Sequence, residues 1–331
     1  MTRSHRTFLA SGMVLCLAFT ASACSTGGNT TDTAPVASAN FPATVVNCGN
    51  EVTFDAPPQR VVVLRNEVIP VLSSLDVLDR VVGLVGQFHD EYFDQETNQL
   101  LDEVPVLSDE ISQVGGGEIS IEEILAQGPD LVIGTSETVT RDALIAQGVP
   151  VLENEESCEA SQATSTLADI DTLFQLYADV FDRQDEADAA LARIDTQIED
   201  AVARIEPGED RTAAMLYPTL GGGPAYTYGS GSMNHNLLEL AGFTNVFADT
   251  PDRTFEVSVE DLLARDPDVL ILLHSGAEPT EVEAAITALP GADGLTAVRE
   301  GDLVPLLFGF TSPASPITVE GLDRIVKSTQ G

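Results

Sequence analysis

The sequence contains no tryptophan and only one lysine, Lys327, among its 331 residues. Basic residues are scarce, because 15 lysines and arginines stand against 53 aspartates and glutamates, and the formal net charge is −38. A surface of this sign repels nucleic acids and anionic lipid headgroups, so neither is expected as a partner. Beyond the N-terminal segment, no run is apolar enough to span a membrane.

The N-terminus has the layout of a secretory signal. Arg3 and Arg6 precede an apolar run over 8–19, which is too short to cross the hydrocarbon core of a bilayer. We therefore predict a signal peptide over 1–23 and an extracytoplasmic location for the mature chain.

Small residues at 21–23 lead directly into Cys24, an ending that resembles a lipobox. Such a cysteine is acylated and becomes the new N-terminus, which predicts a lipid anchor to the cell membrane. The residues over 24–44 are rich in Ser, Thr, Gly and Ala and predict a flexible tether. The alternative is an ordinary signal peptide that is cleaved before an unmodified Cys24.

Four cysteines are present, and two remain after the predicted processing. Cys16 leaves with the signal peptide and Cys24 carries lipid, so Cys48 and Cys158 are left. A remaining pair in an oxidising compartment usually bonds, which predicts a Cys48–Cys158 disulfide. A two-cysteine metal site is the alternative, but no CxxC or Cys/His spacing supports it, and we predict no metal site.

The length and the 43% hydrophobic content allow two domains with cores of their own. An internal repeat supports this division. The segment Ser120–Ile133 returns as Ser258–Ile271, each with a capping serine, an acidic first turn, a Pro-Asp turn and an apolar strand. Two copies that match this closely indicate two related lobes.

A helical pattern separates the two copies. Apolar residues recur at three- and four-residue spacing from Ala187 to Ile205 and stop at Pro207-Gly208. The helix would be about 30 Å long, which suits a rigid connection, and it is too short for a coiled coil. We predict an N-terminal α/β lobe over 45–182, an interlobe helix over 183–207 and a C-terminal α/β lobe over 208–331.

Several short motifs follow one another in a characteristic order behind the lipobox. Besides the two repeat units they are the segments 58–64 (PQRVVVL), 79–83 (DRVVG), 236–242 (NLLELAG), 245–247 (NVF) and 312–316 (SPASP). In this order they resemble the helical-backbone (class III) ABC transporter substrate-binding lipoproteins that carry ferric siderophores, haem and corrinoids. The resemblance extends from Cys48 to Gly331.

This resemblance implies two Rossmann-like lobes joined by a single long α-helix, with a ligand cleft between them. It also implies a monomer without enzymatic activity or intrinsic cofactor, which delivers its ligand to an ABC permease in the cytoplasmic membrane. Proteins of this family dock onto the permease through one glutamate on each lobe, and the matching positions are Glu122 and Glu260. The alternative role of either carboxylate is to cap its own helix or stabilise its dipole.

Side chains on the loops that follow the strands are candidates for the ligand-binding site, because strand ends meet at one edge of such a sheet. In the first lobe they are Arg65, Asn66, Gln87, Phe88, Thr135 and Ser136. In the second lobe they are Tyr217, Tyr226, Tyr228, Met233, His274, Phe308 and Phe310. The glycines at 221–223 allow close backbone approach, and the neighbouring tyrosines offer flat surface with a hydroxyl.

The charge of these candidates points to a class of ligand. Arg65 is the only basic residue among them, and it can alternatively pair with Glu67. A highly anionic chelate requires several cationic partners. The sequence therefore favours a neutral, weakly charged or cationic iron chelate, such as an Fe(III)-hydroxamate siderophore, while haem and corrinoids stay open.

Two other functions are alternatives, direct metal binding and hydrolysis. Direct zinc or manganese binding would use His89, His235 and His274, but these residues form no histidine-rich loop. Hydrolysis would need a nucleophile, and Tyr228–Ser232 superficially resembles a GxSxG elbow although no glycine follows Ser232. We therefore expect a binding protein and not an enzyme.

Overall fold

A computed structural model of the protein describes residues 40–110, 117–158, 165–206 and 210–329. The predicted signal peptide, Cys24 and most of the predicted tether lie outside these residues. The first strand begins at Ala43, so the last two residues of the predicted tether 24–44 belong to the folded part instead. Ala43 and Thr44 pair with Phe54 and Thr53 in an antiparallel hairpin, which holds them in place. No helix of the described residues is both long and apolar enough to cross a membrane.

The first lobe, called the N-lobe, contains a five-stranded parallel sheet in the order β5-β4-β3-β6-β7. An antiparallel hairpin, β1 with β2, precedes this sheet. The strands are β1 (Ala43–Asn47), β2 (Asn50–Phe54), β3 (Val61–Val63), β4 (Val81–Val85), β5 (Val106–Ser108), β6 (Leu131–Ile133) and β7 (Val151–Leu152). The helices are α1 (Ile69–Ser74), α2 (Gln95–Leu101), α3 (Ile121–Ala126), α4 (Arg141–Ala146) and α5 (Asp169–Phe181).

The second lobe, called the C-lobe, contains a six-stranded mixed sheet in the order β11-β9-β8-β12-β13, with β10 paired to β8. Strands β9 and β11 form an antiparallel edge. The strands are β8 (Thr212–Tyr217), β9 (Ala225–Thr227), β10 (Thr244–Asn245), β11 (Phe255–Val257), β12 (Val269–His274) and β13 (Leu303–Leu307). The helices are α7 (Met233–Leu240), α8 (Val259–Arg265), α9 (Pro279–Thr287), α10 (Thr296–Glu300) and α11 (Pro316–Thr329).

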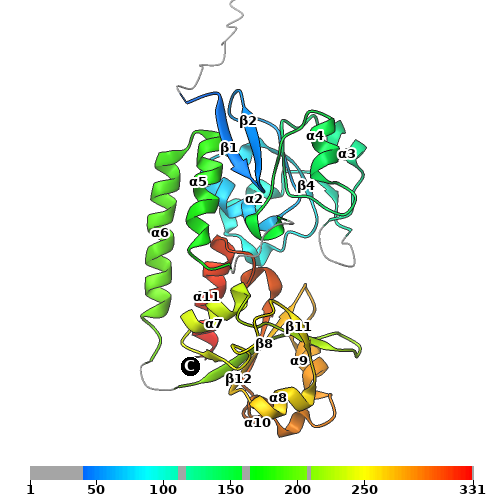
Figure 1. Cartoon of the computed structure of the whole chain (residues 1–331), viewed down its shortest axis with the longest axis vertical. Coiled ribbons are helices and arrows are strands. Elements are labelled where there is room, and N and C mark those ends of the chain that lie inside the picture. Colours follow the sequence, from blue (N-terminus) through cyan, green and yellow to red (C-terminus); the bar gives the residue numbers. More distant parts are fainter. Residues whose placement is uncertain (1–39, 111–116, 159–164, 207–209, 330–331) are drawn as a thin grey trace, which may run out of the picture. The chain divides into compact units, whose positions relative to one another are not determined.

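The two lobes are connected by the long helix α6 (Gln184–Val202), which lies beside α5 and α11 (Figure 1). Asp182, with a φ of 58°, ends α5 in the left-handed conformation and separates it from α6. The 19 residues of α6 span about 28 Å. The fold is thus the predicted pair of Rossmann-like α/β lobes with one long helix between them.

The central strands are buried on both faces, as parallel sheets between helices are. Val61 and Val63 pack into one core cluster, while Val62 between them packs into another with α3 and α4. In the C-lobe, Leu270 and Leu272 likewise pack towards α8 and α9. The opposite faces of both sheets belong to a single cluster that also includes side chains of α5, α6, α7 and α11. One continuous hydrophobic core therefore extends through both lobes.

The sequence repeat forms equivalent units, α3–β6 and α8–β12, whose strands lie directly beside the central strands β3 and β8. Ser120 and Ser258 cap their helices in complete capping boxes. The aspartate of each Pro-Asp turn accepts hydrogen bonds from the neighbouring strand start: Asp130 from the amides of Gln59 and Arg60, Asp268 from the amide of Thr212, all at 2.8 Å. Each aspartate thus holds two adjacent strands in register.

Cys48 and Cys158 form a disulfide, the pair expected from the cysteine count. It links the turn of the β1–β2 hairpin to the short 3₁₀ turn η4 (Glu155–Ser157) that follows β7. The cross-link joins residues 110 positions apart within the N-lobe.

Candidate functional site

A cavity of about 390 Å³ lies between the carboxyl ends of the strands of both lobes, and we call it the cleft. Strand ends and the loops after them are the usual location of ligand sites in open α/β sheets. The N-lobe lines the cleft with Leu64, Arg65, Asn66, Glu67, Val85, Gly86, Gln87, Phe88, His89, Tyr92, Gly117, Glu156 and Ser157. The C-lobe contributes Arg253, Ser275, Phe308, Gly309, Ser312 and Pro313.

Five of the predicted ligand-binding residues line this cleft: Arg65, Asn66, Gln87, Phe88 and Phe308. The Asn66 side-chain amide donates to the Gln87 carbonyl at 3.2 Å, which fixes the loops after β3 and β4 against each other. Arg65 donates through Nη2 to the Thr135 carbonyl at 3.1 Å, while its Nε is buried and has no partner in the described parts of the chain. An unsatisfied donor in a cleft is available to a ligand.

Three further predicted residues support the cleft from behind its wall. Thr135 holds Arg65 through its carbonyl and donates its own hydroxyl to Glu153 at 2.6 Å. The Tyr217 hydroxyl lies 3.0 Å from Ser275 Oγ, and its ring packs edge-on against Phe308 at 6.0 Å. His274 Nδ1 accepts from the Gly276 amide, and burial lowers the pKa of this imidazole.

The remaining predicted residues lie elsewhere. Tyr226 faces outward because strand β9 alternates, and its hydroxyl donates to Glu256. Tyr228 and Met233 are buried in the core, and burial raises the pKa of the Tyr228 hydroxyl. Phe310 is also buried, between the Tyr92 ring and the Arg324 guanidinium. Ser136 caps its own loop by accepting from the Val139 amide.

Tyr92 is a cleft residue that the sequence did not reveal. Its hydroxyl accepts from the Gly309 amide at 3.1 Å and so connects the two lobes. A Cβ at Gly309 would lie 2.7 Å from the Tyr92 ring, so only glycine allows this approach. Burial raises the pKa of Tyr92 to about 12, which keeps its hydroxyl protonated near neutral pH.

Glu156 and Arg253 form a second interlobe link that the sequence did not reveal. Arg253 Nη2 lies 2.5 Å from Glu156 Oε2, and the Ser312 hydroxyl donates to the same oxygen at 3.3 Å. The other carboxylate oxygen, Oε1, is buried without a partner. The expectation that Arg65 is the only basic residue of the cleft is therefore wrong, because Arg253 lines it too.

The charges that line the cleft are nearly balanced. Two guanidinium groups, Arg65 and Arg253, stand against the carboxyl groups of Glu67 and Glu156. Glu67 is 7% exposed, and burial raises its pKa, while the neighbouring Arg65 opposes this shift. Such a lining matches a ligand of small net charge better than a highly anionic one.

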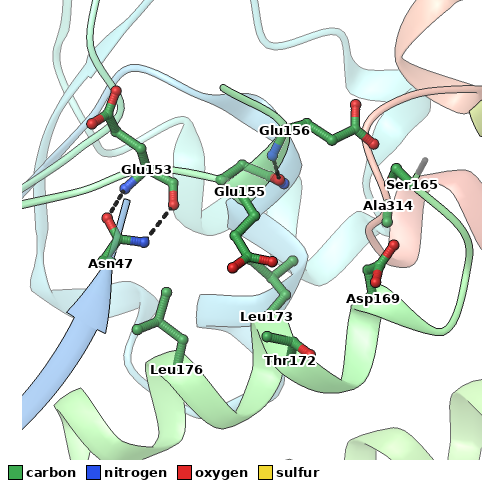
Figure 2. A pocket seen from close by; sticks show the side chains of 11 residues that line it. Asn47, Glu153, Glu155, Glu156, Ser165, Asp169, Thr172, Leu173, Leu176 and Ala314 are labelled. Carbon is green, nitrogen blue, oxygen red and sulfur yellow. Dashed lines mark hydrogen bonds between the residues drawn. The ribbon is translucent and has the colours of Figure 1, made fainter. Parts of the chain in front are cut away.

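A smaller cavity of about 60 Å³ lies beside the cleft and shares Glu156 with it (Figure 2). Asn47 closes one side, since its amide donates to the Glu153 carbonyl at 2.8 Å and accepts from the Glu153 amide at 2.9 Å. Polar and acidic side chains of β1, residues 153–156, Ser165 and α5 make up most of the lining.

Glu122 and Glu260 occupy equivalent positions, the second residue of α3 and of α8, and both are exposed. The capping boxes use the following residues, Glu123 and Asp261, whose pKa values are lowered by hydrogen bonds from the capping serines. Capping therefore does not explain Glu122 or Glu260. Neither carboxylate has an ion-pair partner within the described parts of the chain.

The three histidines of the alternative metal-binding hypothesis lie in different places. His89 lines the cleft, His274 lies behind it, and His235 on α7 contacts Glu239. Within the described ranges, no three His, Cys, Asp or Glu side chains lie together as a group that could hold a metal ion.

Comparison with known proteins agrees with this architecture. The family model for a periplasmic binding protein matches residues 61–306. The crystal structure of an ABC-type Fe3+-hydroxamate transport system from Saccharomonospora viridis is 45% identical in sequence, has a TM-score of 0.79, and covers 87% of this chain and 99% of its own.

More distant relatives bind other ligands. The cobalamin-binding protein of Halobacterium salinarum is 26% identical over 305 residues, which is 87% of this chain and 74% of that protein. The periplasmic heme-binding protein RhuT from Roseiflexus sp. RS-1 is 21% identical, with a TM-score of 0.65 over 82% of this chain and 98% of its own. At this identity the likeness concerns the fold alone.

The family match spans most of the chain, and the fold has the two lobes and the long connecting helix of the class III binding proteins. Proteins of this kind bind a solute without transforming it. The chain belongs to the periplasmic binding protein family, whose members serve ABC importers as solute-binding proteins and are not enzymes.

Proposed function

We propose that this protein captures a ferric hydroxamate siderophore outside the cytoplasmic membrane and delivers it to an ABC permease. The observation that carries this proposal is the 45% identity to the Saccharomonospora viridis protein over 87% of the chain. The ligand is cargo, and the protein needs no cofactor of its own.

The lining of the cleft supports a chelate of this class. Its volume of about 390 Å³ lies within the range of about 300 to 1,000 Å³ that is usual for small organic ligands. Phe88, Tyr92 and Phe308 offer apolar and aromatic surface to the chelate's backbone. The free Nε of Arg65 offers a donor to a hydroxamate oxygen. A tris-catecholate complex carries a high negative charge and would meet the carboxylates of Glu67 and Glu156.

Membrane attachment and delivery complete the proposal. Acylated Cys24 would anchor the chain, and residues 24–42 would serve as the tether. The exposed carboxylates of Glu122 and Glu260 would pair with basic side chains on the permease, one for each lobe.

The proposal is tested on the soluble protein beginning after Cys24. Because the chain lacks tryptophan, binding is best measured by isothermal titration calorimetry and thermal shift. The panel contains a ferric trihydroxamate, a ferric tris-catecholate, haem, cobalamin, and zinc or manganese ions, with the iron-free trihydroxamate as control.

We expect the ferric trihydroxamate to raise the melting temperature, since a ligand at a hundred times its dissociation constant adds about 2.7 kcal/mol of stability. Arg65→Ala should weaken this binding by about tenfold, while Arg193→Ala, an exposed substitution on α6, should leave it unchanged. A shift with cobalamin or with free metal alone would contradict the hydroxamate assignment.

Haem is the second candidate, because His89 and Tyr92 line the cleft and both side-chain types serve as axial haem ligands. Tyr92 is already bonded to the Gly309 amide, which leaves His89 as the freer group. Haem binding would be recognised by an absorption spectrum that changes in the His89→Ala variant. A haem spectrum identical in both proteins would exclude ligation by His89.

A further inference from the structure

The smaller cavity beside the cleft, here called the acidic pocket, is lined by four carboxylates: Glu153, Glu155, Glu156 and Asp169. Polar oxygen or amide groups of Asn47, Asn154, Ser165 and Thr172 complete its polar lining, and none of the described residues that line it is an arginine or lysine. The pocket therefore presents acceptors without a positive charge of its own.

Arginines outside the pocket neutralise only part of this charge. Arg141 forms a salt bridge with Glu153 at 2.5 Å, and Arg253 pairs with one oxygen of Glu156. Asp169 accepts from the Thr166 amide at 2.7 Å, a bond that leaves its charge in place. Glu155 is exposed at the rim. Net negative charge therefore stays at the pocket.

Two buried polar atoms at the pocket have no hydrogen-bond partner among the residues that the structure describes. They are Glu156 Oε1 and Ser165 Oγ, and Ser165 is only 7% exposed. In Figure 2 the Glu156 carboxylate extends towards Ser165. Buried acceptors without partners are rare and destabilising, unless a ligand or water supplies the missing donors. A group with several N–H donors would satisfy both atoms.

Glu156 lines both the acidic pocket and the cleft, so the two cavities are neighbours on either side of this residue. We infer that the acidic pocket is a subsite for a positively charged arm of the bound chelate, a primary ammonium group in contact with Glu156 and Ser165. This inference rests on the proposed function, since it specifies which hydroxamate chelates the cleft prefers.

The size of the pocket agrees with such a group. Its volume of about 60 Å³ exceeds the roughly 10 to 15 Å³ that one water molecule needs on the same measure. It admits the end of an alkylammonium chain and excludes a second chelate. An ammonium group has three donors and no acceptor, which complements a lining of carboxylates and hydroxyls.

A matched pair of ligands tests the inference. One is a linear ferric trihydroxamate that ends in a primary amine, and the other is the same chelate with that amine acetylated. Calorimetry at low ionic strength should show the ammonium form binding about tenfold more tightly or better, a preference that added salt reduces. Equal affinities would overturn the subsite and leave the proposed function intact. If neither chelate binds, the proposed function fails.

Variants of the pocket locate the effect. Glu156→Gln, and separately the double variant Glu155→Gln with Ser165→Ala, should reduce the ratio of the two affinities towards one. Glu281→Gln, an exposed acidic position on α9, should keep the wild-type ratio. Melting temperatures without ligand confirm that each variant folds. If the pocket variants weaken both chelates by the same factor, the pocket acts only on the structure of the cleft and the inference is wrong.

Discussion

The two lobes share a framework but differ in what they add to it. Each has a central strand pair held by the aspartate of a Pro-Asp turn, and each presents an exposed glutamate, Glu122 or Glu260, as the second residue of the helix before that turn. The cleft loops are unequal, because most of the polar lining comes from the N-lobe while the C-lobe adds Arg253, Phe308 and small residues. The repeated part thus suits docking and strand register, and the divergent part suits ligand recognition.

The largest expected effect comes from removing both members of the repeated pair of glutamates. Cells with the Glu122→Ala/Glu260→Ala double variant should lose ligand uptake to background, because both predicted contacts with the permease are gone. The affinity of the purified variant for its ligand should stay within about twofold of wild type, as neither residue lines the cleft. Each single variant should transport at an intermediate rate.

Uptake is measured with the radiolabelled chelate, and Glu281→Ala is the control for loss of an exposed carboxylate. Reduced ligand affinity in the double variant would refute the separation of docking from binding.

The second-largest expected effect comes from the disulfide, which only the N-lobe has. Cys48–Cys158 lies in the N-lobe, and the C-lobe contains no cysteine. Cys48→Ser/Cys158→Ser should lower the free energy of unfolding by about 2 to 5 kcal/mol, because the unfolded chain regains the freedom of a long loop. Urea unfolding of the oxidised wild type and the variant measures this difference. A reductant should destabilise only the wild type, and equal sensitivity of both proteins would contradict the assignment.

The aspartates of the Pro-Asp turns test whether the framework is equivalent in both lobes. Asp130→Ala and Asp268→Ala should each cost about 1 to 2 kcal/mol of unfolding free energy, since each leaves strand-start amides without their acceptor. Thermal and urea unfolding give the two values. If one variant leaves the free energy of unfolding unchanged, the two repeat units are equivalent in sequence but do not stabilise their lobes equally.

The smallest effect concerns the buried carboxylates, Glu67 and Glu153, both of which lie in the N-lobe among the residues the structure describes. Burial raises the pKa of Glu67 above its unfolded value of 4.5, so the protonated form favours the folded state. Its contribution to stability is complete below pH 4.5 and is lost as the pH rises through the folded pKa.

Glu67→Gln should therefore be more stable than the wild type at neutral pH, and this gain should vanish in acid. Urea unfolding at several pH values measures it. A difference that does not change with pH would mean that folding leaves the pKa of Glu67 unshifted.

The framework could be predicted because its signals are local in the sequence. The segment Ser120–Ile133 has only 14 residues and contains a capping serine, an acidic first turn and a Pro-Asp turn. These signals define a helix and a strand without reference to the rest of the chain. The same signals identified the two lobes. The antiparallel edge β9–β11 was not predicted, since its short strands flank glycine-rich or irregular segments without strong periodicity.

The cleft could be predicted only in part, because its composition depends on contacts between distant residues. Glu156 meets Arg253 and Ser312, which lie 97 and 156 positions away. Neighbours in sequence also diverge: Phe308 lines the cleft, whereas Phe310 is buried in the core, because a 3₁₀ turn over these residues rotates the two rings apart. No residue pattern reveals which side of such a turn faces a ligand.

The hydrophobic core that continues from one sheet to the other has a consequence for cooperativity. Buried side chains of α5, α6 and α11 pack with strands of both lobes, so neither lobe can open its inner face without exposing apolar surface of the other. Heating should therefore melt the lobes in a single transition, with equal calorimetric and van't Hoff enthalpies. A chelate held by a few side chains of the cleft would then stabilise the molecule as a whole, including the distant surfaces where α3 and α8 begin.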